Sequence, residues 1–147
     1  MSEHVRQTDP FRWEGVEVKP YKGEGTHFSG ITRQALFQGG DGLGCELRYF
    51  EIAAGGWSSL ERHRHVHAVI VVRGEGQALV GDCILALGPN DLVQVPPSTW
   101  HQFRATSGVP LGFLCLVECG RDAPERPDAG VLSVLRSDPA IAAFVRV

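Results

Sequence analysis

Candidate metal ligands are concentrated in one short stretch of this chain. One glutamate and three histidines fall within seven residues, and another histidine follows downstream: Glu61, His63, His65, His67 and His101. Imidazole and carboxylate groups together suit borderline divalent metals such as iron, manganese, nickel or zinc. The stretch therefore predicts a metal site.

These candidates cannot converge on one ion if the chain stays extended. Alternate residues of a strand share a face, so Glu61 and His63 would lie about 6.6 Å apart, whereas His67 would lie about 13 Å from His63. We therefore expect the chain to bend within residues 64–66. His101 must then arrive from a separate strand.

Short apolar runs separated by turns supply such strands. Breakers such as Gly81-Asp82 and Gly88-Pro89-Asn90 interrupt the runs, which is typical of an antiparallel sandwich or barrel. The sequence therefore predicts an all-β fold. The eight expected strands cover residues 31–38, 44–52, 68–73, 77–80, 83–87, 92–95, 101–105 and 111–119.

The two ends of the chain differ from this pattern. Residues 1–30 carry prolines, glycines and mixed charges, and they predict an arm over the barrel. After Pro127 a short helix is expected over residues 131–135, and Ser137-Asp138-Pro139 is typical of the start of a second one over 140–147. We expect a barrel over residues 31–120 and a helical tail over 121–147 packed on it.

Length and composition favour one globular domain. The 147 residues are 43% hydrophobic and 21% charged, enough to bury a core. A net charge of -3 gives no general attraction to nucleic acid or membrane. The N-terminus lacks the apolar core of a signal peptide, so a cytoplasmic location is expected. The four cysteines are accordingly expected to be free thiols.

The histidine-rich stretch resembles the first motif of the cupins, small jelly-roll barrels with two metal-binding motifs. That motif runs Gly, five residues, His-x-His, three or four residues, Glu, six residues, Gly. Counting back from Gly74 puts His67 at the Glu position and His63 and Glu61 at the two His positions, with Gly55 at the opening glycine. The spacing fits, with Glu and His exchanged.

The second cupin motif is matched at Pro96 and His101. Its glycines and asparagine are replaced, at Asn90, Ser98 and Ala105. With the flanking strands, the resemblance covers about residues 31–119. It implies a double-stranded β-helix, the cupin barrel, with one divalent metal.

The resemblance also assigns roles to the candidate ligands. It implies metal ligation by Glu61, His63, His67 and His101, although Glu61 as an acceptor that fixes a histidine tautomer is an alternative. His65 falls outside the counted positions. It is then a general base beside the metal, a substitute ligand or a solvated turn residue.

Other side chains near the motifs are candidates for substrate binding or catalysis. Arg48 suits a phosphate or carboxylate, because its guanidinium presents a fixed fork of donors. Trp100 and Phe103 either line a substrate pocket or pack in the barrel. Cys115 and Cys119 would lie about 13 Å apart on one strand, beyond the roughly 7 Å limit for a disulfide. Each is a small hydrophobe or a reactive thiolate.

More narrowly, the chain resembles a cupin subgroup that includes the methylthioxylulose-phosphate methylsulfurylases, manganese-dependent enzymes of methionine salvage. The resemblance rests on the Glu-Arg-His-Arg-His-Val-His string, the arm over residues 13–22 and the cysteine-bearing last strand. It implies that a cysteine thiolate takes the methylthio sulfur of a sugar phosphate and that an external thiol such as glutathione reduces the mixed disulfide.

Two alternatives remain beside this interpretation. One is an iron-dependent dioxygenase, and the other is a ligand-binding cupin without turnover. For the preferred interpretation we expect a small-molecule ligand and a homodimer, with manganese first among the metals and iron, nickel or zinc as alternatives.

Overall fold

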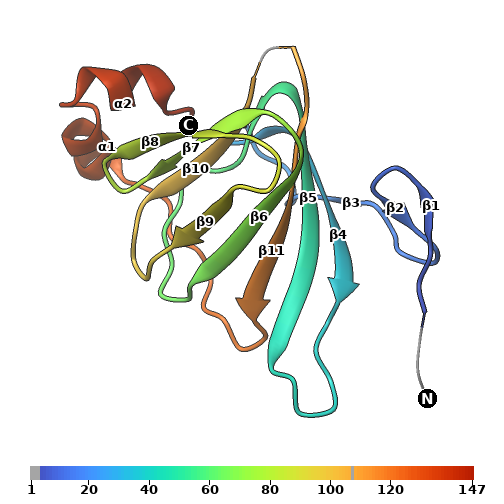
Figure 1. Cartoon of the computed structure of the whole chain (residues 1–147). Coiled ribbons are helices and arrows are strands. Elements are labelled where there is room, and N and C mark those ends of the chain that lie inside the picture. Colours follow the sequence, from blue (N-terminus) through green and yellow to red (C-terminus); the bar gives the residue numbers. More distant parts are fainter. Residues whose placement is uncertain (1–3, 107) are drawn as a thin grey trace.

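Antiparallel strands make up most of the computed structural model, which describes residues 4–106 and 108–147 (Figure 1). The strands form a sheet that curls into a half-barrel, and two short helices follow them. The expected all-β fold class is confirmed. Residues 1–3 of the expected arm and residue 107 of the expected barrel lie outside the described residues.

All eight expected strands are present, with ends that differ by a few residues. The largest difference is in β5, which continues past Ile52 to Trp57 because Trp57 still pairs with Ser29 and Arg104. The bounds are β4 Ser29–Phe37, β5 Cys45–Trp57, β6 His67–Gly74, β7 Gly76–Val80, β8 Cys83–Leu87, β9 Leu92–Val95, β10 His101–Ala105 and β11 Leu111–Glu118.

Strand β5 joins the two parts of the curled sheet. On one side the order is β4, β5, β11, β6 and β9, all antiparallel. On the other, the end of β5 pairs with β10, which pairs with β7, and β7 pairs with β8. The inner face of the curl holds the larger cluster of buried apolar residues, including Val69, Val71, Phe103 and Phe113.

Two glycines allow the chain to cross between these parts. Gly74 ends β6 with a φ of 70°, and a Cβ there would lie 1.7 Å from the carbonyl oxygen of Pro110. Gly55, near the end of β5, has a φ of 76° with open space around its Cα. Both adopt the left-handed conformation that favours glycine. These two glycines are the first and last residues of the first motif, and the loop between β5 and β6 lies between them.

The N-terminal arm runs beside β4 and contacts both faces of the sheet. Its strands are β1 Gln7–Asp9, β2 Arg12–Trp13 and β3 Lys19–Pro20, the last paired with β4. Phe11 stacks on Tyr49 with ring centroids 5.3 Å apart. Tyr21 contacts Phe50, whose ring lies on the opposite face, with centroids 5.9 Å apart. The arm therefore brings residues after β3 to the inner face.

The two helices lie on the side of β7 and β8 (Figure 1). They are α1 Ala129–Leu135 and α2 Pro139–Phe144, each started by an aspartate cap, Asp128 and Asp138. The second helix ends before the expected residue 147. Ile141 and Phe144 pack with Leu79 in a second buried cluster. Among the described residues, no helix has the length and apolar character needed to cross a membrane.

Candidate metal centre

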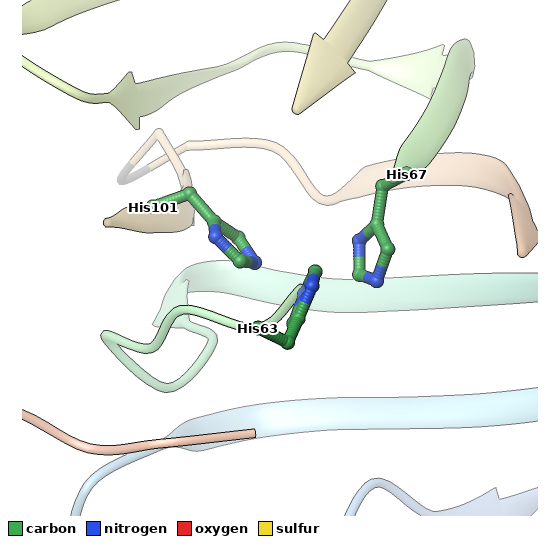
Figure 2. A group of neighbouring side chains, drawn as sticks. All are labelled: His63, His67 and His101. Carbon is green, nitrogen blue, oxygen red and sulfur yellow. The ribbon is translucent and has the colours of Figure 1, made fainter. Parts of the chain in front are cut away.

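Three of the expected ligands come together at one end of the half-barrel (Figure 2). His63 lies in the loop after β5, His67 begins β6 and His101 begins β10. One ring nitrogen from each lies within 4.8 Å of the others. The chain bends at Arg64 and His65, as the spacing required.

Backbone pairing holds the ligand-bearing loop against β10. Glu61 and His101 exchange two backbone hydrogen bonds, of 3.1 and 2.9 Å. The carbonyl of His63 accepts a hydrogen bond from the amide of Ser98 at 2.7 Å. The loop is therefore fixed on both sides of the bend, and the three imidazoles converge without regular strand structure at His63.

Hydrogen bonds orient two of the imidazoles for ligation. Nδ1 of His63 donates to the carbonyl of His65 at 2.8 Å, and Nδ1 of His101 donates to the carbonyl of Thr99 at 2.9 Å. Because each Nδ1 carries the hydrogen, each Nε2 presents a lone pair. Nε2 of His63 is buried and has no hydrogen-bond partner in the described part of the chain.

Burial keeps the cluster uncharged. Desolvation, helped by neighbouring His101, lowers the pKa of His63 to about 4. Burial also lowers the pKa of His67 and of His101. Neutral imidazole is the form that binds metals, and the buried lone pair on Nε2 of His63 is free to bind one. The residues therefore fit a borderline divalent cation.

His65 lies beside the cluster and contacts an unexpected residue, Asp122. Its Nδ1 lies 2.8 Å from Oδ1 of Asp122, and its Nε2 lies 3.2 Å from Nε2 of His67. Hydrogen bonds from the Arg64 amide and from His65 hold the pKa of Asp122 well below its usual range, so the carboxylate accepts the Nδ1 hydrogen. His65 is also buried and stacks on His63. This geometry excludes the solvated-turn interpretation.

A cavity beside the histidine cluster, the histidine cavity, is lined by Glu61, His63, His65 and His67, and Glu61 has a partner there from the N-terminal arm. The Glu61 carboxylate accepts a hydrogen bond from the ammonium group of Lys22. The adjacent Tyr21 also lines the cavity, and burial raises the pKa of its hydroxyl. The N-terminal arm thus forms one wall of the histidine site.

Cys115 faces this site from β11. Its side chain is buried, and it lines a second, smaller cavity together with His67, His101 and Phe103; His67 and Glu61 line both cavities. Burial raises the pKa of the Cys115 thiol, while Arg48, whose Nη2 lies 3.6 Å from the sulfur, opposes that effect. The thiol is thus shielded from water beside a fixed positive charge.

The structure does not bring Cys119 or Trp100 to the cavity. Cys119 lies beyond the end of β11, is exposed and donates from its thiol to the carbonyl of Gln38. Trp100 precedes His101, packs against the cluster below the helices and lies under the guanidinium of Arg62. Since neighbouring residues of an extended chain face opposite ways, the inward His101 directs Trp100 outward.

Several residues that line the histidine cavity could not be predicted from the sequence, because they lie far from the two motifs. Tyr21 lies in the N-terminal arm, for which the sequence predicted a place over the barrel and no role at the site. The others carry no spacing signal that relates them to the histidines: Lys22, Arg33, Arg121 and Asp122. Their proximity depends on how the arm and the segment after β11 fold back on the sheet.

Comparison with known proteins agrees with this geometry. Residues 48–117 match the model of the family described as cupin domain. A 1-methylthio-D-xylulose 5-phosphate methylsulfurylase of Rhodospirillum rubrum is 50% identical over 136 residues, which cover 92% of this chain and 86% of that protein. The chain belongs to the cupin family.

Solved structures place this cupin beside close and distant relatives. A cupin 2 conserved barrel domain protein from Rhodopseudomonas palustris is 51% identical, with a TM-score of 0.93, and the match covers 99% of this chain and 100% of that one. A polyketide cyclase from Streptomyces resistomycificus is 19% identical, with a TM-score of 0.75 over 99% and 100% of the two chains. That second likeness concerns the fold alone.

Proposed function

We propose that this cupin is a metal-dependent methylsulfurylase that acts on 1-methylthio-D-xylulose 5-phosphate. The observation that carries the proposal is a buried thiol, Cys115, on the same cavity wall as His67 and His101. The 50% identity to the Rhodospirillum rubrum methylsulfurylase supports the same activity. A cysteine beside a metal centre suits removal of a sulfur substituent from a ketose.

Manganese(II) is the proposed metal, held by His63, His67 and His101 with Glu61 as a fourth ligand. When bound, it supplies a Lewis acid that polarises the oxygens of the substrate. Lys22 must then release the Glu61 carboxylate with which it pairs. Before metal binds, the ammonium group of Lys22 balances the charge of this carboxylate within the cavity.

Cys115 is the proposed nucleophile. Its thiolate attacks the methylthio sulfur, a sulfur–sulfur bond forms, and the carbon–sulfur bond breaks with its electron pair left on the sugar carbon. That carbon takes a proton, which gives the deoxyketose. Arg48 lies 3.6 Å from the sulfur and stabilises the thiolate.

His65 is the proposed proton-transfer group. Asp122 fixes its ring through Nδ1, so Nε2 is the nitrogen directed toward the histidine cluster. An external thiol such as glutathione then attacks the mixed disulfide on Cys115, and a second thiol equivalent releases methanethiol. The two thiols supply the two electrons that cleavage of the carbon–sulfur bond requires.

The decisive experiment compares cysteine variants of the manganese-loaded protein. With substrate and dithiothreitol we expect methanethiol and the deoxyketose phosphate from wild type, and from Cys119→Ser and Cys83→Ser, whose thiols are exposed. Cys115→Ser should fall to background while retaining its metal. Without thiol, mass spectrometry should find the methylthio group on Cys115.

Two outcomes would contradict the proposal. Turnover by Cys115→Ser at the wild-type rate would exclude the cysteine mechanism. Oxygen uptake by an iron-loaded sample, with no need for thiol, would support the dioxygenase alternative instead.

We also propose a cytoplasmic homodimer. All four cysteines are free, in keeping with a reducing compartment. The outer face of β6, β9 and β11 carries an apolar groove of about 480 Å³, and Leu92 on it is 79% exposed. Apolar surface of this kind is typical of a protein interface.

A further inference from the structure

Several cationic side chains line the histidine cavity. This cavity has a volume of about 200 Å³ and is lined by four of them: Lys22, Arg33, Arg48 and Arg121. Lys22 pairs with Glu61, and Arg121 pairs with Glu46 at 2.7 Å. Among the described residues, no carboxylate lies within ion-pair distance of Arg33 or Arg48.

Strand register puts these two arginines on the same face. Arg33 of β4 lies opposite Phe50 of β5, and Arg48 lies opposite Ala35. Because positions two apart on a strand share a face, Arg33 and Arg48 are diagonal neighbours, whose Cα atoms are expected about 7–8 Å apart. The intervening pair, Gln34 and Tyr49, faces the other way.

Both guanidinium groups keep unused donors. Arg48 donates through Nη2 to Cys115 and lies over the ring of Phe50, but its Nε is buried without a partner in the described chain. Arg33 donates through Nε to the carbonyl of Pro20 at 3.3 Å. A buried guanidinium donor without a partner, as in Arg48, is unfavourable unless an acceptor completes it.

We propose that Arg33 and Arg48 form a phosphate-binding subsite beside the histidine cluster. Phosphate oxygens suit two guanidinium groups, which present planar forks of donors. The identity of the ligand as a phosphorylated ketose rests on the proposed function. The ketose end then lies toward His63 and His67, which line the same cavity, and the phosphate lies toward β4.

The test measures binding without any chemistry at sulfur. Calorimetry on the manganese-loaded protein compares D-xylulose 5-phosphate with D-xylulose, neither of which carries a methylthio group. Wild type should prefer the phosphorylated sugar. Arg33→Gln should weaken binding of that sugar by about 10–100-fold, because a charge-assisted hydrogen bond to the phosphate is lost, while binding of D-xylulose and metal content stay unchanged.

Arg64→Gln is the matched control. It removes one positive charge near the site, but its side chain is 85% exposed and does not line this cavity. Equal binding of the two sugars by wild type, or an equal loss in Arg33→Gln and Arg64→Gln, would overturn the subsite. Phosphate preference that depends on Arg33 in a protein without thiol-dependent turnover would support the subsite and contradict only the methylsulfurylase assignment.

Discussion

Asp122 accepts a hydrogen bond from Nδ1 of His65 at 2.8 Å, although 57 residues separate them in the sequence. The same carboxylate accepts the backbone amides of Arg64 at 2.8 Å and His65 at 3.1 Å. One side chain therefore fixes both the bend of the loop that carries His63 and the tautomer of the imidazole beside the histidine cluster.

Replacement of Asp122 by asparagine tests this relationship. An amide has no charge and only one acceptor oxygen, so it cannot hold both the backbone amides and the ring. We expect turnover to fall about 10–100-fold, as for other residues that orient groups at metal sites, with metal content retained. Glu125→Gln is the control, because Glu125 anchors the same loop through Arg62 at an exposed ion pair. Wild-type turnover in Asp122→Asn would remove Asp122 from the mechanism.

Stability of the metal-free protein should depend on pH in a direction set by His63. Burial lowers its pKa in the folded state from 6.5 to about 4, so the unfolded chain binds more protons between these values. The free energy of unfolding is then greatest above pH 6.5 and falls as the pH drops toward 4. Urea titrations of chelated protein across this range measure the slope. His63→Gln should reduce the slope without abolishing it, because burial also lowers the pKa of His67 and of His101. A slope of the opposite sign would contradict the buried neutral cluster.

Gly74→Ala should be strongly destabilising. The new Cβ would lie 1.7 Å from the Pro110 carbonyl oxygen, in addition to the strain of a positive φ. We expect the free energy of unfolding to fall by about 3 kcal/mol or more. Gly55→Ala shares the positive φ but meets open space, so its smaller loss separates strain from collision. Equal losses in the two variants would show that the collision is relieved by local movement.

Leu92→Glu tests the outer face as a dimer interface. Light scattering should give a dimer for wild type. In the variant the dissociation constant of the dimer should rise about tenfold or more, because a charge would be buried at the contact. Val134→Glu is the control: Val134 is 73% exposed on α1, away from the groove. A monomeric wild type would exclude the dimer.

The sequence predicted the strands and the convergence of His63, His67 and His101, because both follow from local rules. Apolar runs between turn residues define short strands, and the motif spacing relates His67 and His101 to the strands that became β6 and β10, although β6 begins one residue earlier than expected. From Phe113 to Glu118, the side chains of β11 alternate between buried and more exposed positions, as expected for a strand. This alternation does not extend to Cys119, because the strand ends one residue earlier.

The remaining wall of the site could not be predicted from local rules. Lys22 reaches Glu61 across 39 residues, through an arm whose strand pairing with β4 is limited to Lys19 and Pro20. Arg33 faces the cavity only because β4 pairs with β5 in one particular register. Contacts of this kind depend on tertiary packing, and no motif in a single sequence records them.

The position of Tyr21 and Lys22 on the cavity wall has a consequence for how cupins diverge. The segment that matches the family, residues 48–117, contains the histidine cluster and Cys115, whereas Tyr21, Lys22 and Arg33 precede it. In the proposed function the metal ligands, the nucleophile and Arg48 thus lie within the family segment, whereas Arg33 adds a ligand contact from outside it. An inherited core can keep its reactive centre while exchange of the flanking segments changes which molecule reaches it.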